Sequence, residues 1–146
     1  MFMGKHDNET IALGNVFSFR LPNGKYAFGR VYKDTAAAIY NKFSDDPHDA
    51  PIGCRDFLFN VGFAEEELFN GDCRVIGNDP FSDLEDAWPP PVYIYCEASN
   101  SYCILHKGKV CEASWEECRG LSDASILPLE KLIEKVLDCS YEELAC

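Results

Sequence analysis

The chain has 146 residues, 47% of them hydrophobic, and it carries 19 aromatic side chains. This length and apolar content exclude a disordered chain and predict a single domain, residues 1–146, with a buried core. The net charge of −12 argues against nucleic acid or an anionic membrane as a direct partner, because both are bound through lysine and arginine.

The negative charge is concentrated in the middle of the chain. Residues 34–86 contain three basic and thirteen acidic side chains, a local balance of 3 − 13 = −10. Such a surface favours a basic partner through electrostatic steering. The alternative is a solvated acidic face that only keeps the protein soluble.

The cysteine pattern and the first residues predict a cytoplasmic protein. Met1-Phe2-Met3 leads directly into polar residues, which gives no signal peptide, and no apolar run reaches the length of a membrane span. The eight cysteines include no C-x-x-C pair, so we expect reduced structural thiols, no metal and no cofactor.

The first predicted elements form a hairpin, after a loosely ordered stretch over residues 1–13. Alternation over 15–21 predicts a half-buried strand, and Asn23-Gly24 predicts the turn because both residues tolerate a positive φ. One face of this strand carries Phe17, Phe19 and Leu21, and the other carries Val16, Ser18 and Arg20.

The return strand, residues 26–32, contains one glycine and one arginine among aromatic side chains. Gly29 predicts a bulge or a close approach to the backbone. Arg30 has two interpretations: its guanidinium stacks on Tyr26 or Phe28 and pairs with a nearby acid, or it faces a partner.

Further strands are expected at 37–43, 55–63 and 73–76, with helical turns at 64–69 and an extended connector at Pro89–Pro91. Residues 92–113 predict two or three strands with a turn at 107–109. The pair Ser114 and Glu117 fits a capping box, so a short helix begins there.

A longer helix is expected after Pro128, with an apolar stripe of Leu129, Leu132, Ile133, Val136 and Leu137. The predicted fold is therefore α+β and mainly antiparallel. Six or seven strands form a strongly bent sheet or small barrel, with the C-terminal helix packed on it.

Residues that could carry catalysis are few. Cys103 and His106 stand three apart on a predicted strand, so they point to opposite faces and cannot form a thiolate–base pair. No phosphate-binding, hydrolase, metalloprotease or calcium-loop motif is present. We therefore expect no catalytic residues.

The hairpin resembles the opening signature of the immunity protein 26 family of bacterial polymorphic toxin systems. That signature has a Gly-Asp-Val-Phe strand, a tight turn and a Tyr-x-Phe-Gly-Arg-Val strand. Residues 37–43, 71–77 and 115–127 resemble later parts of the family pattern, whereas Asn15 and Cys73 depart from it. The matching positions are Gly14, Val16, Phe17, Gly24, Tyr26, Phe28, Gly29, Arg30 and Val31.

The resemblance implies an inhibitor that binds a cognate secreted toxin and neutralises it by steric block, as a monomer or weak dimer. A basic toxin, such as a nuclease, would complement the charge. In this interpretation the scaffold comprises Gly14, Phe17, Gly24, Tyr26, Phe28, Gly29 and Arg30. The candidates for toxin contact are Asp45, Asp46, Asp49, Asp56, Glu65, Glu66, Glu67, Phe69 and Trp88.

Two other classes of function stay open from the sequence. A small enzyme or ligand-binding barrel predicts a deep pocket with convergent polar groups and perturbed carboxylates. A phage-associated structural or accessory protein predicts a large apolar patch for self-association.

Overall fold

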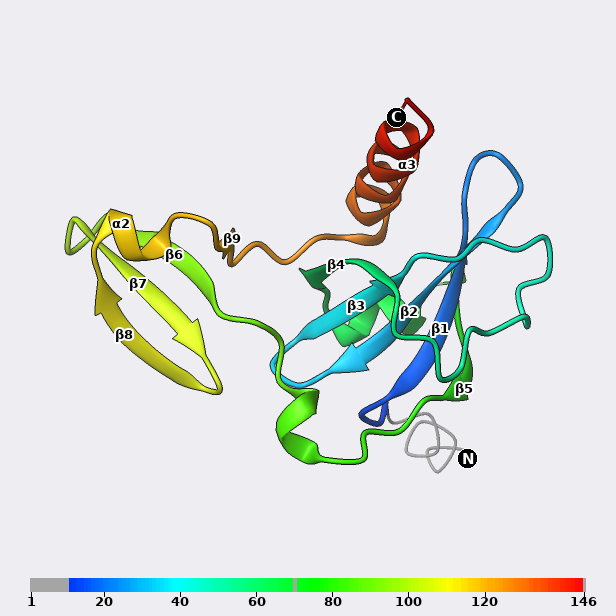
Figure 1. Cartoon of the computed structure of the whole chain (residues 1–146), viewed down its shortest axis with the longest axis horizontal. Coiled ribbons are helices and arrows are strands. Elements are labelled where there is room, and N and C mark those ends of the chain that lie inside the picture. The colour runs from blue at the N-terminus through cyan, green and yellow to red at the C-terminus, as the bar shows by residue number, and fades with distance from the viewer. Residues whose placement is uncertain (1–10, 70, 146) are drawn as a thin grey trace.

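The computed structural model describes residues 11–69 and 71–145, the last six of them, 140–145, by their backbone alone. These residues form two β-sheets and a long C-terminal helix (Figure 1). Residues 1–10, expected to be loosely ordered, lie outside the described residues. The strands are β1 (Asn15–Arg20), β2 (Tyr26–Tyr32), β3 (Ala36–Tyr40), β4 (Phe57–Gly62), β5 (Cys73–Asn78), β6 (Val92–Cys96), β7 (Ser101–His106), β8 (Lys109–Ala113) and β9 (Ser122–Asp123). The helices are η1 (Glu65–Phe69), η2 (Leu84–Ala87), α2 (Trp115–Cys118) and α3 (Leu129–Ala145).

The larger sheet is antiparallel, and its strand order is β4-β3-β2-β1-β5. The hairpin β1–β2 lies at its centre, as the alternation predicts. Its turn differs in detail from the expectation, because Gly24 has a φ of 88° whereas Asn23 is not among the described residues with positive φ. Instead, the Asn23 side chain accepts a hydrogen bond from the Lys25 N–H at 2.9 Å.

Both faces of this sheet are covered, so the expectation of a half-buried first strand is wrong. Val16 and Ser18, on the face predicted to be solvated, are 0% and 2% exposed. The segment 41–56 folds over that face and is joined to β2 by two backbone hydrogen bonds between Tyr26 and Ser44. Alternation identifies the two faces of the strand, but a covering loop is a tertiary feature that it does not reveal.

The opposite face holds the main core, which contains Phe17, Phe19 and Ile39. Gly29 lies directly opposite Phe17, and a Cβ placed on Gly29 would come within 2.3 Å of the Phe17 ring. The close approach expected at Gly29 is thus a ring over the backbone, and only glycine leaves room for it.

The helix α3 packs on the main core through its predicted stripe. Leu129, Leu132 and Val136 are buried in the core, and Ile133 and Leu137 pack against it half-buried. Among the described residues, no helix combines the length and the apolar content that a membrane crossing requires.

The smaller sheet has the order β8-β7-β6-β9 and stands apart from the larger one in Figure 1. The capping box of α2 is formed as predicted, by Ser114 and Glu117. The fold is therefore mainly antiparallel α+β, but its strands are divided between two open sheets and are not closed into a barrel. The strand pattern does not reveal this division, because it gives the strands without their partners.

Candidate functional site

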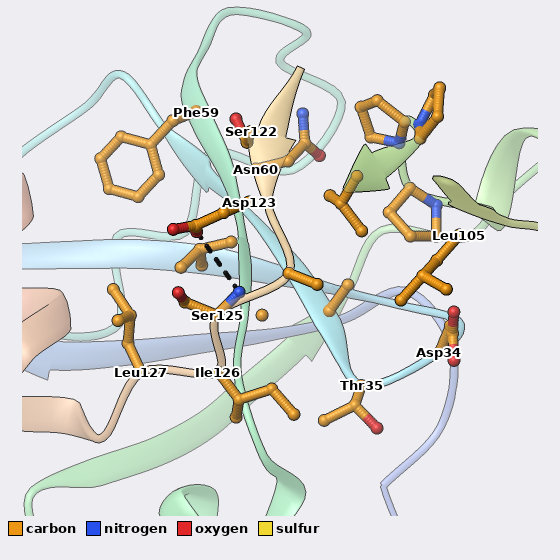
Figure 2. Close-up of a pocket in the computed structure, with 18 of the residues that line it drawn as sticks. Asp34, Thr35, Phe59, Asn60, Leu105, Ser122, Asp123, Ser125, Ile126 and Leu127 are labelled. Carbon is orange, nitrogen blue, oxygen red and sulfur yellow. Dashed lines mark hydrogen bonds between the residues drawn. The ribbon is translucent and has the colours of Figure 1, made fainter. Parts of the chain in front are cut away.

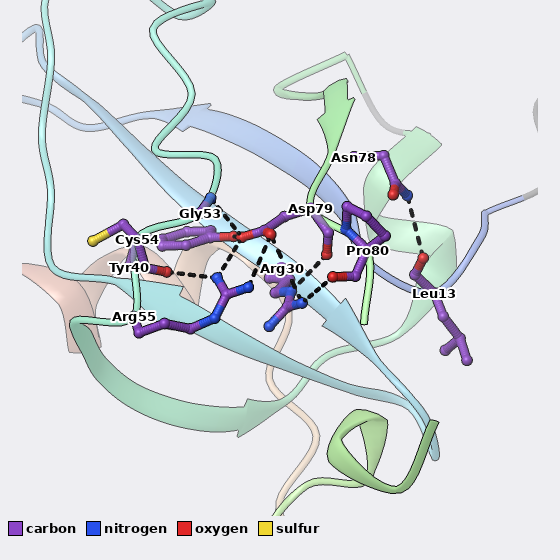
Figure 3. Close-up of polar contacts among 9 residues, drawn as sticks. All are labelled: Leu13, Arg30, Tyr40, Gly53, Cys54, Arg55, Asn78, Asp79 and Pro80. Atoms are coloured by element: carbon purple, nitrogen blue, oxygen red, sulfur yellow. Dashed lines mark hydrogen bonds and ion pairs between the residues drawn. The ribbon is translucent and has the colours of Figure 1, made fainter. Parts of the chain in front are cut away.

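A buried polar network fixes the segment 41–56 against the larger sheet (Figure 3). Its centre is Asp79, which follows β5 and is 2% exposed. The Oδ2 atom of Asp79 accepts hydrogen bonds from the Tyr40 hydroxyl at 2.7 Å and from the Gly53 N–H at 3.1 Å. Arg55 donates to both carboxylate oxygens, at 2.8 and 3.2 Å. One carboxylate thus connects β3, the covering segment and the end of β5.

Arg30 approaches the same centre from β2. Its Nε donates to the backbone carbonyl of Asp79 at 2.8 Å, and its Nη2 donates to that of Pro80 at 2.9 Å. The guanidinium carbon lies 3.7 Å from the centroid of the Phe81 ring. Arg30 is 3% exposed. It therefore lies in the interior, stacked on Phe81 rather than on Tyr26 or Phe28, and does not face a partner.

The electrostatics of Asp79 follow from these contacts. Burial alone would raise the pKa of the carboxyl group, but the hydrogen bonds from Arg55, Tyr40 and Gly53 and the charge of Arg30 hold it below the ordinary 3.8. The pKa of Tyr40 is raised, by burial and by its hydrogen bond to the Asp79 carboxylate. The network is consequently a charged one in the folded state at neutral pH.

Gly14 of the family signature also serves this network. Its φ is 83°, and a Cβ on it would lie 2.7 Å from the backbone oxygen of Asp79. The Asp79 N–H in turn donates to the Gly14 carbonyl at 2.7 Å. Sequence reasoning missed Asp79, because the pair with Arg30 spans 49 residues and no local pattern marks it.

The four aspartates predicted for toxin contact in the covering segment are exposed. Asp45 pairs with Lys25 at 2.9 Å, and Asp49 pairs with Lys42 at 3.4 Å. Asp46 accepts from the His48 N–H, and Asp56 accepts from the Asn41 side chain at 3.2 Å. The polar network holds the segment that carries them, so these acids occupy fixed positions on one face of the sheet.

The acids of η1 lie on the other face. Leu68 of η1 belongs to the main core together with α3, and Glu65, Glu66 and Phe69 are exposed beside it. Glu67 Oε1 accepts a hydrogen bond from the Leu129 N–H at 2.7 Å. Glu67 therefore caps the N-terminus of α3, a role that its place in an acidic run does not suggest.

Trp88, the last of the predicted contact residues, is half-buried. The ammonium nitrogen of Lys33 lies 4.6 Å from the centroid of its ring. The predicted contact residues thus lie in two groups. Glu65 of η1 and Trp88 line one cavity of about 380 Å³, whereas the aspartates of the segment 41–56 lie on the opposite face of the larger sheet.

A groove of about 490 Å³ lies between the two sheets (Figure 2). One wall is β4, from Phe59 to Gly62, with the β2–β3 turn at Asp34 and Thr35 beside it. The other wall is formed by Pro89–Pro91 and by the adjoining ends of β6 and β7. The segment 122–127 runs between the walls, with a parallel pairing to β6 and an isolated parallel bridge from Ile126 to Gly62.

The structure does not bring together Cys103 and His106, the pair considered for catalysis from the sequence. Cys103 pairs with Glu112 and His106 with Lys109 along the ladder β7–β8, and a separation of three residues places the two side chains on opposite faces. Over the described residues, no group of three or more histidine, cysteine or acidic side chains could hold a metal ion. The carboxyl group with a displaced pKa, Asp79, does not line the groove.

Cys54, Cys73, Cys96, Cys103, Cys111 and Cys118 are free thiols in the structure. Burial raises the pKa of Cys73 to about 12, and burial also raises the pKa of Cys118. The pKa of Cys96 is lowered by a hydrogen bond from the Ser99 side chain. Cys146 lies outside the described residues.

Exposed apolar side chains gather on the smaller sheet. Ile94 and Val110, 45% and 67% exposed, lie on one face of the sheet. Trp115, 44% exposed, packs edge-on against Tyr93 and tilted against Tyr102 on the other face, so these side chains do not form one continuous apolar patch.

Comparison with models of known protein families gives a match for the chain. Residues 12–104 match the family model described as Immunity protein 26. The comparisons with curated proteins and with solved structures give no match. The family match covers 93 of the 146 residues (104 − 12 + 1), from before β1 into β7. The chain therefore belongs to the immunity protein 26 family.

Proposed function

We propose that this protein binds one cognate secreted toxin in the cytoplasm and neutralises it by covering the toxin's functional surface. The single observation that carries the proposal is the match to the Immunity protein 26 family. Steric block relies on a rigid scaffold with fixed surface groups and needs no catalytic residue. The role proposed here is therefore not enzymatic.

The scaffold supports this proposal physically. The Asp79 network and the double covering of the larger sheet hold the acidic segment 41–56 in one conformation, so little conformational entropy is lost on binding. The exposed Asp45, Asp46 and Asp49, in a chain of charge −12, favour a basic toxin surface. Glu65, Glu66 and Phe69 would contribute from the opposite face, whereas Glu67 is engaged as a helix cap.

Co-expression tests the proposal. The cognate toxin domain, sought in the gene neighbouring this one, is expressed in a sensitive bacterial host, with the protein or with an empty vector. We expect survival only with the protein, and co-elution of the two chains on a sizing column. Cell death in the presence of well-expressed protein, together with separate elution of the two chains, would refute the proposed function.

A further inference from the structure

The groove between the two sheets contains an unpaired strand edge. β4 is the end strand of its sheet, so one of its sides, the open side, faces away from β3. Within the described part of the chain, the only β-bridge on this side joins Gly62 to Ile126. There the Leu127 N–H donates to the Gly62 carbonyl at 2.9 Å, whereas the Phe63 N–H donates inward, to Thr35 at 3.0 Å. Backbone groups alternate in direction along a strand, so Asn60 directs its N–H and C=O to the open side, as Gly62 does.

An open edge of this kind is a template for another extended chain. Asn60 lines the groove, and the groove volume of about 490 Å³ lies within the range typical of ligand sites. The segment 122–127 of the chain itself already binds at one end of this edge in an extended conformation, through the bridge from Ile126 to Gly62. The geometry of the groove therefore suits an extended segment of polypeptide rather than a helix.

The lining of the groove provides side-chain pockets as well as a backbone edge. Its apolar side chains are Phe59, Pro89, Pro90, Pro91, Val92, Leu105 and Ile126. In strand addition the main-chain hydrogen bonds supply affinity, and pockets for alternate side chains supply specificity.

The charges in the groove favour a cationic segment. Both lysines that line it are engaged: Lys107 pairs with Glu85 at 2.8 Å, and the Lys135 ammonium nitrogen lies 4.9 Å from the centroid of the Phe59 ring. The Asp34 carboxylate has no hydrogen bond or ion pair within the described part of the chain, and Asp123 accepts only a long 3.4 Å bond from the Ser125 N–H. The ring contact leaves the charge of Lys135 in place, so two lysines stand against the carboxylates of Asp34, Asp123 and Glu85, a balance of 2 − 3 = −1 that favours a cation.

We propose that this groove binds an extended, basic segment of the cognate toxin, which adds as a further strand to the open edge of β4. This inference rests on the proposed function and names the partner element that the groove recognises. It places the recognition of toxin at Asn60, Asp34 and Asp123, which are not among the residues predicted for contact from the sequence.

The test uses the full chain and the purified cognate toxin domain, made harmless to its producer by mutation. Hydrogen exchange of the Asn60 amide is followed by NMR with and without saturating toxin. We expect this amide to exchange at least tenfold more slowly in the complex, because its N–H becomes bonded to the added strand. An unchanged rate in a saturated complex overturns the proposal.

Matched variants test the same edge by affinity. Asn60→Pro removes the outward N–H, whereas Asn60→Ala keeps it, so we expect at least tenfold weaker toxin binding for the first and a change within twofold for the second. The double change Asp34→Asn with Asp123→Asn should weaken binding at least threefold at low salt. If Asn60→Pro does not fold, the aspartate variants and the amide exchange still decide the outcome.

The two proposals fail in different ways. If the wild-type protein forms no complex with the toxin, the proposed function is wrong. If the wild-type protein binds and all groove variants bind equally well, only the groove proposal is wrong, and the toxin contacts another surface.

Discussion

At the scale of single residues, Asp79 is the group on which the packing of the larger sheet depends most. It is the counter-charge of the buried Arg30, with 3.8 Å between Arg30 Nη2 and Asp79 Oδ1, and the acceptor for Tyr40, Gly53 and Arg55. Removal of one partner of a buried pair leaves the other charge uncompensated, which is more costly than loss of the pair's own attraction.

We predict that Asp79→Asn lowers the free energy of unfolding by about 3–5 kcal/mol. The asparagine keeps the shape of the side chain but leaves Arg30 buried without a carboxylate. Tyr40→Phe removes a single hydrogen bond to the same carboxylate and should cost about 1.5–3 kcal/mol. Urea denaturation of the three proteins measures both values, and a loss below 1 kcal/mol in Asp79→Asn would show that the network contributes little.

The same residue predicts a pH dependence. Because the pKa of Asp79 is lower in the folded protein than in the unfolded chain, its contribution to stability is complete above the ordinary value of 3.8 and is lost as the pH falls through the folded value. Denaturation midpoints of wild type should therefore fall more steeply below pH 4 than those of Asp79→Asn. Parallel curves for the two proteins would contradict this assignment.

Thr35, in the β2–β3 turn, has a strained backbone. Thr35 has a φ of 54°, which is rare for a β-branched residue, and its carbonyl is held by the Phe63 N–H at 3.0 Å. A left-handed conformation costs an L-residue about 1–2 kcal/mol, which glycine avoids. Glycine in turn loses more conformational entropy on folding, and this offsets part of the gain in stability.

We predict that Thr35→Gly raises the free energy of unfolding by about 0.5–1 kcal/mol. Ala36→Gly is the matched control, since Ala36 is not among the described residues with positive φ, and this change should destabilise by about 0.5–1 kcal/mol. Both values come from chemical denaturation. Equal destabilisation by the two glycines would mean that Thr35 bears no strain.

At the scale of elements, α3 is fixed by two different interactions. Its apolar stripe packs on the main core, and its first N–H, that of Leu129, is capped from η1 by Glu67 at 2.7 Å. A carboxylate at this position satisfies an otherwise unpaired donor and interacts favourably with the helix dipole.

We predict that Glu67→Ala lowers the free energy of unfolding by about 1–2 kcal/mol, the usual cost of a lost helix cap. The neighbouring Glu66 is exposed, so Glu66→Ala should stay within about 0.5 kcal/mol of wild type. Thermal unfolding of the two variants makes the comparison. Equal stabilities would show that Glu67, like Glu66, is only a surface charge.

What the sequence could predict at this scale is set by the range of each interaction. The stripe of α3, the box at Ser114 and the hairpin at Gly24 are local patterns, and the structure has all three. The cover over Val16, the cap from Glu67 to Leu129 and the centre at Asp79 join residues far apart in the chain. Periodicity says nothing about such contacts. The groove escaped prediction for the same reason, since it exists only between two sheets whose separation the strand pattern does not specify.

At the scale of the whole molecule, charge and shape together define the surface available to a toxin. The exposed aspartates of the segment 41–56 form weak surface pairs or none, and such pairs contribute about 0–1 kcal/mol to stability. Their charges can therefore be changed with little effect on folding. An acidic surface acts on a partner chiefly through the rate of association, which salt screens.

We predict that simultaneous reversal of Asp45, Asp46 and Asp49 to lysine slows toxin association roughly tenfold or more at low salt, with little change in dissociation. The loss should shrink as salt rises past roughly 0.5 M, because the Debye length falls to a few ångströms. The matched control reverses Glu97, Glu112 and Glu116, three exposed acids in the β6–β7 turn, β8 and α2, and so gives the same change in net charge. Stopped-flow measurements with both variants separate three outcomes. A larger effect at Asp45–Asp49 locates the steering there, equal effects mean that only net charge matters, and an unchanged rate at low salt means that these aspartates only solvate the protein.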